Sequence, residues 1–214
     1  MTGVELAAVA KIGVVTYDSL EDAIAAAETN DTVEVLKDLA LNNKLVIDQN
    51  ITLTSAGENA ITIKPAATAS NLGSMVQITG SATLKNIVLD GDKKCRVLIL
   101  SKTEEPEITV TLGEGTKIIN GSVTNGSGGG GVAVETGAAK ANLIIDGAEI
   151  TGNSATGVKT DGTGGSGGGV FFGQTKCDLT IKSGTISNNH AELYAGGVWI
   201  ASTATGEMLG GTVS

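Results

Sequence analysis

The sequence predicts an all-β fold, a right-handed single-stranded parallel β-helix with a short capping α-helix at its N-terminal end. Three observations favour this fold: a pattern that returns at unequal intervals, apolar runs that are too short for helices, and 31 glycines against two prolines in 214 residues. Repeats of roughly 20–50 residues are typical of solenoids. Glycine supplies the sharp corners that each turn of a solenoid needs.

The repeated unit is a β-rich segment with a polar corner, followed by a glycine-rich loop and a short apolar strand. Its equivalent isoleucines, Ile118, Ile150 and Ile186, lie 32 and 36 residues apart, so the loops vary in length while the strands persist. Such a unit cannot bury its apolar face alone, but it can do so against its neighbours in a stack. The three copies occupy 110–134, 143–172 and 179–200, with Val132, Val170 and Val198 as their equivalent strand valines.

Composition and charge exclude several classes of partner. The net charge of −9 and the single arginine, Arg96, argue against nucleic acid, because phosphate binding needs clustered Lys and Arg. The same charge disfavours anionic membrane surfaces, and no apolar run approaches the roughly 18 residues of a membrane-spanning helix. Aromatic residues make up only 2% of the chain, so the expected core is aliphatic. No cofactor and no metal site is predicted.

The two cysteines are predicted to be unpaired. Cys95 and Cys177 precede different strands of coils about three turns apart. Stacked strands rise ~4.8 Å per coil, which separates the two cysteines by ~14 Å. A disulfide joins Cα atoms that lie only ~4.4–6.8 Å apart, so a bridge is not expected.

The first 31 residues are predicted to form a cap over the open first coil. Their one helix is expected over 18–28, with Asp18 or Ser19 as the N-cap and acidic residues in the first turn. The apolar stripe of this helix would cover core side chains that otherwise face water. The apolar stretch over 4–15 is expected to form an edge strand or to cover the same coil. The stripe consists of Leu20, Ala23, Ile24 and Ala27.

The β-helix is predicted over 32–214, with short coils to about residue 105 and glycine-loop repeats from 106 onward. Alternation of β-branched and polar residues without intervening helices indicates strands throughout the short coils. The last residues restart the repeat, so we expect a truncated, uncapped C-terminal coil that is open to self-association. The strands expected in the short coils are 33–36, 45–47, 51–53, 61–63, 76–78, 83–89 and 97–100.

A family resemblance adds to this prediction. Residues 16–38 (TYDSLEDAIAAAETNDTVEVLKD) look like the N-terminal capping segment of bacterial surface proteins with pectin-lyase-like right-handed β-helices. The elements GTISNN (184–189) and GGGVFF (167–172) are similar to repeats of adhesin-like cell-surface proteins and of the chlamydial polymorphic outer-membrane family. The resemblance implies an extracellular position at a bacterial surface, with the signal peptide and anchor outside this chain. It also implies a host or environmental glycan or protein as the partner.

Folds of the kind that the resemblance implies often carry polysaccharide-cleaving sites, and glycoside hydrolysis requires facing carboxylates. Asp90 and Asp92, in the segment DGD, are the acidic candidates if the protein is an enzyme. The NTD, DD, GHG and RIK elements of a polygalacturonase-like site do not occur in the sequence. Tight turns select Asp and Gly, so we interpret DGD as a solvated turn. No catalytic residue is predicted.

The glycine-rich loops over 126–131 and 162–169 are interpreted as conformational features. A phosphate-binding loop would need a lysine after the glycines and a helix, and neither is present. A calcium-binding glycine repeat would need an aspartate after the glycines, whereas Asp161 precedes them. Glycine instead permits the positive φ with which a loop rejoins its coil.

Two further sets of side chains are candidates for a repeated role. The asparagines that follow each repeat isoleucine are predicted to form a corner ladder of stacked amides. Phe171 and Trp199 alternate with their neighbours and so lie on the opposite face of their strands. If that face is outward, they would either stack on sugar rings or be buried under a further coil, and with Tyr194 they are the candidate glycan contacts. The ladder asparagines are Asn120, Asn153, Asn188 and Asn189.

The sequence therefore predicts a non-catalytic module of a bacterial cell surface, either adhesin-like or a structural scaffold. The alternative is a carbohydrate-active enzyme, of the polysaccharide lyase or glycoside hydrolase kind, or its inactive glycan-binding remnant. Three acids that converge in one groove would favour the enzyme. Flat ladders on every face would favour the structural module.

Overall fold

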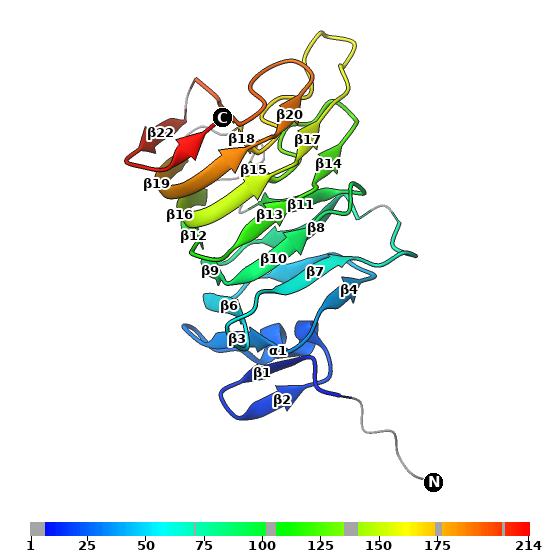
Figure 1. Cartoon of the computed structure of the whole chain (residues 1–214), viewed down its shortest axis with the longest axis vertical. Helices are drawn as coiled ribbons and strands as arrows, with labels where there is room; N and C mark the ends of the chain where they lie inside the picture. Colours follow the sequence, from blue (N-terminus) through cyan, green and yellow to red (C-terminus); the bar gives the residue numbers. More distant parts are fainter. Residues whose placement is uncertain (1–6, 71, 102–105, 135–140, 174–176, 203) are drawn as a thin grey trace.

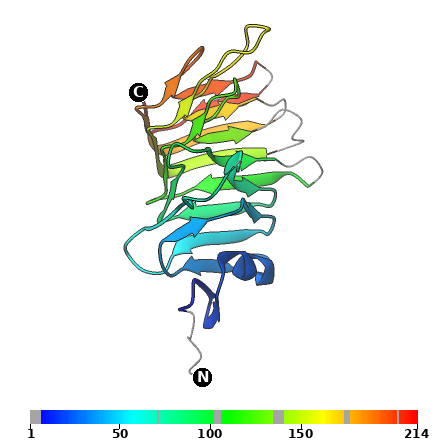
Figure 2. The same cartoon turned by 90° about the vertical axis from the view of Figure 1, so that its right-hand side faces the viewer.

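The computed structural model of the chain describes residues 7–70, 72–101, 106–134, 141–173, 177–202 and 204–214. Short strands lie one above another in a tall stack, with the N-terminal elements at one end and the C-terminal strands at the other (Figure 1). Turning the molecule by 90° shows the same stack from the side, with loops projecting from its margins (Figure 2).

Each coil of the stack contributes strands at equivalent positions. The first three coils are β3 (Thr32–Val35), β4 (Leu39–Leu41) and β5 (Leu45–Ile47); β6 (Ile51–Ser55), β7 (Ile61–Pro65) and β8 (Ser74–Ile78); and β9 (Ala82–Lys85), β10 (Ile87–Asp90) and β11 (Arg96–Leu100). The later coils are β12 (Ile108–Leu112), β13 (Lys117–Ile119), β14 (Ser122–Val123) and β15 (Val132–Val134); β16 (Ala141–Thr151), β17 (Ser154–Ala155) and β18 (Val170–Phe172); β19 (Asp178–Ser187), β20 (His190–Ala191) and β21 (Val198–Ile200); and β22 (Thr205–Met208) with β23 (Thr212–Val213).

Within the described residues these strands form three sheets. The largest joins two columns, β3-β6-β9-β12 and β4-β7-β10-β13, because β16 and β19 run through the corner between them. The second sheet is β5-β8-β11-β15-β18-β21, which we call the front sheet, and the third is the short β14-β17-β20. Every pairing between successive coils from β3 onward is parallel, so the arrangement is consistent with a parallel β-helix.

The repeat read from the sequence sets the register of the later coils. Ile118 pairs with Ile150, Ile150 with Ile186, and Ile186 with Val213. Val132, Val170 and Val198 are stacked in the same way on the front sheet. Ile118, Ile150 and Ile186 are fully buried, so the predicted aliphatic core is confirmed. Each coil therefore covers the apolar side chains of the previous one.

The N-terminal elements cover the first coil. β1 (Ala10–Ile12) and β2 (Val15–Tyr17) form an antiparallel hairpin, and β1 also pairs antiparallel with β3. The helix α1 (Leu20–Ala26) is shorter than the predicted 18–28, and Ser19 is its N-cap, accepting a hydrogen bond from the Asp22 amide at 3.0 Å. The whole predicted stripe is buried in the main core, at Leu20, Ala23, Ile24 and Ala27.

The strand predictions for the short coils need two corrections. Strand β4 was not predicted, because its three residues LAL include no β-branched side chain. The single strand predicted over 83–89 is wrong, because Asn86 adopts a φ of 46° and divides it into β9 and β10. The Asn86 side chain holds this corner by donating a hydrogen bond to the Gly57 carbonyl at 2.8 Å. The predicted change of coil type near residue 105, and residues 4–6 of the predicted edge strand, lie outside the described residues.

Both cysteines are free and buried, Cys95 just before β11 and Cys177 just before β19. Burial raises the pKa of the Cys95 thiol to about 11 and also raises the pKa of Cys177. The Cys177 sulfur accepts a hydrogen bond from the Ala141 amide at 3.2 Å. Among the described residues, no helix is long and apolar enough to cross a membrane.

Candidate functional site

One outward residue from each coil forms a straight row on the front sheet. The parallel registers join the row continuously from one end of the sheet to the other. Its early members are aliphatic or polar and its last two are aromatic. The last three residues of the row line the candidate site. The row consists of Val46, Gln77, Ile99, Ala133, Phe171 and Trp199.

The aromatic end of the row is a stacked pair. The rings of Phe171 and Trp199 lie with centroids 4.8 Å apart and planes only 6° from parallel. Both side chains are half-buried, and Phe171 lies on the face opposite to the buried Val170 and Phe172, as alternation predicted. The Phe171 ring packs against two glycines: a Cβ on Gly128 would lie 1.9 Å from the ring, and one on Gly173 would lie 2.4 Å from it. Glycine at these two positions is what lets the ring lie flat.

Arg96 holds the loop beneath Phe171. Its guanidinium donates hydrogen bonds to the carbonyls of Gly128 at 2.8 Å and Gly129 at 2.9 Å, and to the Ser74 hydroxyl at 3.3 Å. Arg96 is the only arginine of the chain, and its side chain is buried. A buried guanidinium requires several acceptors, and the glycine carbonyls provide them. Sequence reasoning treated Arg96 only as an isolated cation and missed this role.

The glycine loops of successive coils stack beside the aromatic pair. The Gly129 amide donates to the Ser166 carbonyl at 3.1 Å, and the Gly167 amide donates to the Tyr194 carbonyl at 2.9 Å. The equivalent residues Gly129, Gly167 and Ala195 have φ values of 70°, 60° and 52°. These left-handed corners agree with the conformational interpretation of the loops, and they carry Ser166 and Tyr194 over the front sheet.

Together the row and the loops enclose a cleft of about 580 Å³. Its lining includes Phe171 and Trp199 from the front sheet, and Lys159 and Thr163 from the loop that follows β17. Tyr194 is 62% exposed at its mouth. The structure thus brings all three predicted glycan contacts, Phe171, Trp199 and Tyr194, into one cleft. The described residues that line it include hydroxyls, glycine backbone and two cations, Arg96 and Lys159, and no carboxylate.

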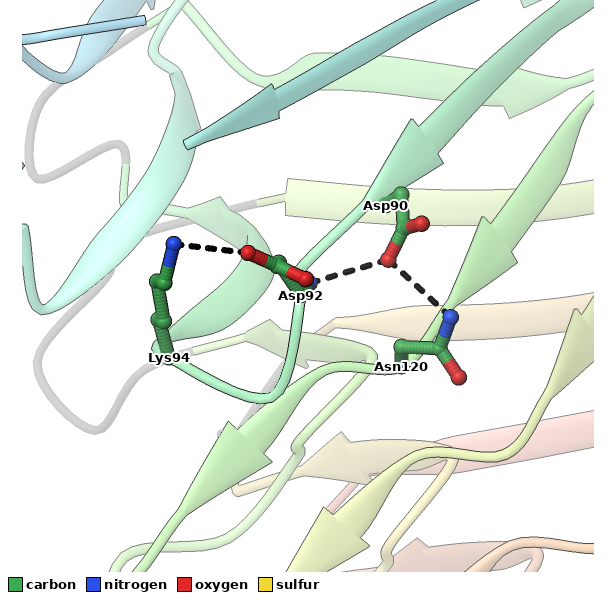
Figure 3. Close-up of polar contacts among 4 residues, drawn as sticks. All are labelled: Asp90, Asp92, Lys94 and Asn120. Carbon is green, nitrogen blue, oxygen red and sulfur yellow. Dashed lines mark hydrogen bonds and ion pairs between the residues drawn. The ribbon is translucent and has the colours of Figure 1, made fainter. Parts of the chain in front are cut away.

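The acidic candidates lie elsewhere, in the turn after β10 (Figure 3). Asp90 accepts hydrogen bonds from the Asp92 amide at 2.9 Å and from the Asn120 side chain at 3.1 Å. The Asp92 carboxylate pairs with Lys94 at 2.6 Å, and this hydrogen bond and charge lower its pKa. Asp92 itself has a φ of 49°. The two aspartates therefore close a turn on each other and on local partners, and neither lines the aromatic cleft.

The predicted asparagine ladder is wrong in its membership. Only Asn153 and Asn189 stack, with the Asn153 side chain donating to Asn189 Oδ1 at 3.0 Å. Asn153 is buried, accepts from the Gly121 amide at 2.7 Å and donates to the Ile118 carbonyl at 3.0 Å. Asn120 and Asn188 lie one residue earlier in register and adopt left-handed φ values of 53° and 54° at the corner. Asn153 and Asn189 thus form the amide stack, and Asn120 and Asn188 form the left-handed corners, whereas all four were predicted to stand in one ladder.

Within the described part of the chain, no group of three or more His, Cys, Asp or Glu side chains is placed to hold a metal ion. Comparison of the chain with known protein families, with curated proteins and with solved structures finds no match in any of the three. The candidate site therefore has to be interpreted from its own geometry.

Proposed function

We propose that the protein is a non-catalytic module of a bacterial cell surface that binds a saccharide in the aromatic cleft. The proposal includes a right-handed, single-stranded, pectin-lyase-like β-helix as its scaffold. The observation that carries it is the convergence of Phe171, Trp199 and Tyr194 on one cleft beside hydroxyl and backbone groups.

The chemistry of this lining suits a sugar. A pyranose ring has an apolar C–H face and a rim of hydroxyls, so it needs an aromatic surface with hydrogen-bonding groups at its margin. Trp and Tyr combine an apolar body with a polar tip, and the indole N–H is a donor. The hydroxyls of Ser127, Thr163 and Ser166 add donors and acceptors around the same cleft. Ligand sites are typically of this kind, mostly apolar with a few placed polar groups.

The lining supports binding rather than hydrolysis. Cleavage of a glycosidic bond requires a pair of carboxyl groups about 5–10 Å apart across the bond. The described residues of the cleft include none, and Asp90 and Asp92 are engaged in their own turn. The bacterial surface as the location rests on the resemblance of residues 16–38 and of the repeats, together with the stacked sheets.

The test uses Trp199, the only tryptophan of the chain, as a fluorescent reporter. Its emission is titrated with oligosaccharides from cellulose, xylan, chitin, mannan and polygalacturonate, and with mucin glycans. We expect saturable quenching with at least one of them, and weaker binding for Tyr194→Ala. Val14→Ala, on the 97% exposed residue of the N-terminal hairpin, is the matched control. Absence of binding to every glycan would leave the scaffold function alone, and release of shortened products would establish an enzyme.

A second variant tests the geometry of the aromatic pair. Gly128→Ala puts a methyl group where the Phe171 ring lies, so it should displace the ring, weaken binding and change the near-ultraviolet circular dichroism. The double variant Gly128→Ala with Phe171→Ala has no ring to displace. The alanine should then add no further loss to that of Phe171→Ala alone. Equal losses from Gly128→Ala with and without the ring would show that this substitution does not act through the Phe171 ring, and full binding by Phe171→Ala would show that the stack is irrelevant.

A further inference from the structure

A second hollow of about 320 Å³ lies on the same front sheet, directly beside the aromatic cleft. The two hollows share Arg96 and Ser127 as a common rim. The floor of the second is the earlier part of the same outward row, at Gln77 and Ile99. The two hollows are therefore neighbours along the stacking direction of the coils, separated by the rim of Arg96 and Ser127.

The lining of the second hollow differs in chemistry from that of the cleft. Its described residues include no aromatic side chain, and amides and hydroxyls predominate. The Lys44 ammonium donates to Gln77 Oε1 at 3.2 Å, and the Gln77 amide donates to the Ser101 hydroxyl at 2.6 Å. This network fixes the orientation of the Gln77 amide at the floor. An oriented amide with neighbouring hydroxyls is suited to hydrogen-bonding the hydroxyl groups of a ligand.

The two hollows together extend further than one sugar ring. From Gln77 on β8 to Trp199 on β21 the front sheet makes four steps between adjacent strands. At ~4.8 Å for each step, the two residues are separated by about 19 Å along the stack. A single ring bound at the aromatic pair would leave the polar section empty.

We propose that the two hollows are subsites of one groove and that the ligand is an extended oligosaccharide chain lying along the axis of the stack. Its rings contact the Phe171–Trp199 pair at one end, and its hydroxyls bond to the Gln77 network at the other. The protein therefore recognises the interior of a linear polysaccharide rather than a terminal monosaccharide. This inference rests on the saccharide-binding function proposed above.

The experiment measures affinity as a function of chain length. Trp199 emission is titrated with cello-, xylo- and chito-oligosaccharides and with oligogalacturonides, each from one to six residues. For the series that binds, we expect the dissociation constant to fall at least tenfold between one residue and about four, and then to level off. Gln77→Ala should weaken binding of the hexamer several-fold and leave the shortest ligand that binds unchanged. Trp199→Phe, followed by calorimetry, should weaken both.

Matched controls separate this inference from the function beneath it. Val88→Ala removes an outward residue of β10, on a different sheet, and should leave every affinity unchanged. Equal affinity for monomer and hexamer, or no effect of Gln77→Ala on the hexamer, would overturn the second subsite while leaving the aromatic site in place. No binding by any of the four series would overturn the extended subsite for these chains, and no binding to the mannan and mucin glycans as well would overturn the saccharide-binding function.

Discussion

The first three coils and the later coils have the same kind of core and different turns. In the coils from β3 to β11, the chain passes from the large sheet to the front sheet through turns held by local contacts, such as those of Asp90 and Lys94. In the coils from β12 to β21, the same passage forms the third sheet and stacks glycine loops on one another. The candidate cleft lies over the later coils.

This difference separates two parts of each coil: the inward residues that maintain the core, and the turns that shape the surface. The core register requires only one apolar residue at each inward position, and both regions meet that requirement. The turns of the later coils do more, because they hold buried polar groups and extend over the front sheet. Four experiments test whether the two regions differ energetically in the way that their turns differ structurally.

The largest effect is expected for the buried amide of the later coils. Asn153→Ala leaves the buried Gly121 amide and the Ile118 carbonyl without their partners. We expect a loss of about 2–4 kcal/mol in the free energy of unfolding, since each buried unsatisfied group costs about 1–3 kcal/mol. Urea denaturation measures the change. The control is Asn120→Gly, which suits its left-handed φ of 53° and should cost less than about 1 kcal/mol. Equal losses from the two would contradict the division of tasks.

The second effect belongs to the early coils and depends on pH. The Cys95 thiol has a raised pKa of about 11 in the folded chain, against an ordinary value of 9.0. Between these values the unfolded chain loses the proton while the folded chain keeps it, so stability falls as pH rises from about 9 to 11. The loss should reach up to about 2 kcal/mol. Cys95→Ala should lose less stability over this range, and identical pH profiles for the two chains would refute the prediction.

A smaller and opposite effect is expected at the last glycine-loop corner. Ala195 occupies the left-handed position that Gly129 and Gly167 occupy in the coils before it. Ala195→Gly should raise the free energy of unfolding by about 0.5–1 kcal/mol, because a Cβ is unfavourable at this φ. The reciprocal change Gly167→Ala should lower it, since its Cβ would meet the Val170 carbonyl at 2.3 Å. Thermal unfolding of both variants gives the comparison, and a destabilised Ala195→Gly would count against it.

The smallest effect is expected for the exposed turn of the third coil. The Asp92–Lys94 pair is solvent-exposed, and pairs of this kind contribute little to stability. Asp92→Asn should therefore leave the unfolding midpoint unchanged within error, and it should also leave saccharide binding unchanged. The turn interpretation would be replaced by a catalytic one under two conditions. The natural chain would have to cleave a glycan, and Asp90→Asn or Asp92→Asn would have to abolish that cleavage.

Much of the fold could be predicted because stacking imposes a pattern on the sequence. The isoleucines at 118, 150 and 186 had to share one inward position, and the structure pairs them in that order. The stripe of the N-terminal helix was predictable for the same reason, since four apolar residues recur at helical spacing. The strand β4 was missed because its three residues, LAL, include no β-branched side chain, whereas the equally short LVI of β5 was predicted.

The site was predictable only in part. Alternation placed Phe171 and Trp199 opposite to their neighbours, and the equivalence of Val170 and Val198 placed them on adjacent strands. That this face is outward and that the rings stack at 4.8 Å depends on packing that the sequence does not show. Lys159 and Ser127 lie on loops whose course no periodicity describes. The choice between Asn188 and Asn189 for the ladder depends on a shift of one residue, which the sequence does not reveal.

The outward row of the front sheet has a consequence for how such a surface changes over time. Each coil adds one side chain to the row at a fixed pitch, while its inward neighbours maintain the core. Where a row residue is exposed, as Val46 is, a substitution changes one surface contact and leaves the inward core residues in place. Duplication of a coil lengthens the row by one position. Selection can in this way change specificity one position at a time, and a protein engineer can do the same by exchanging Val46 or Gln77.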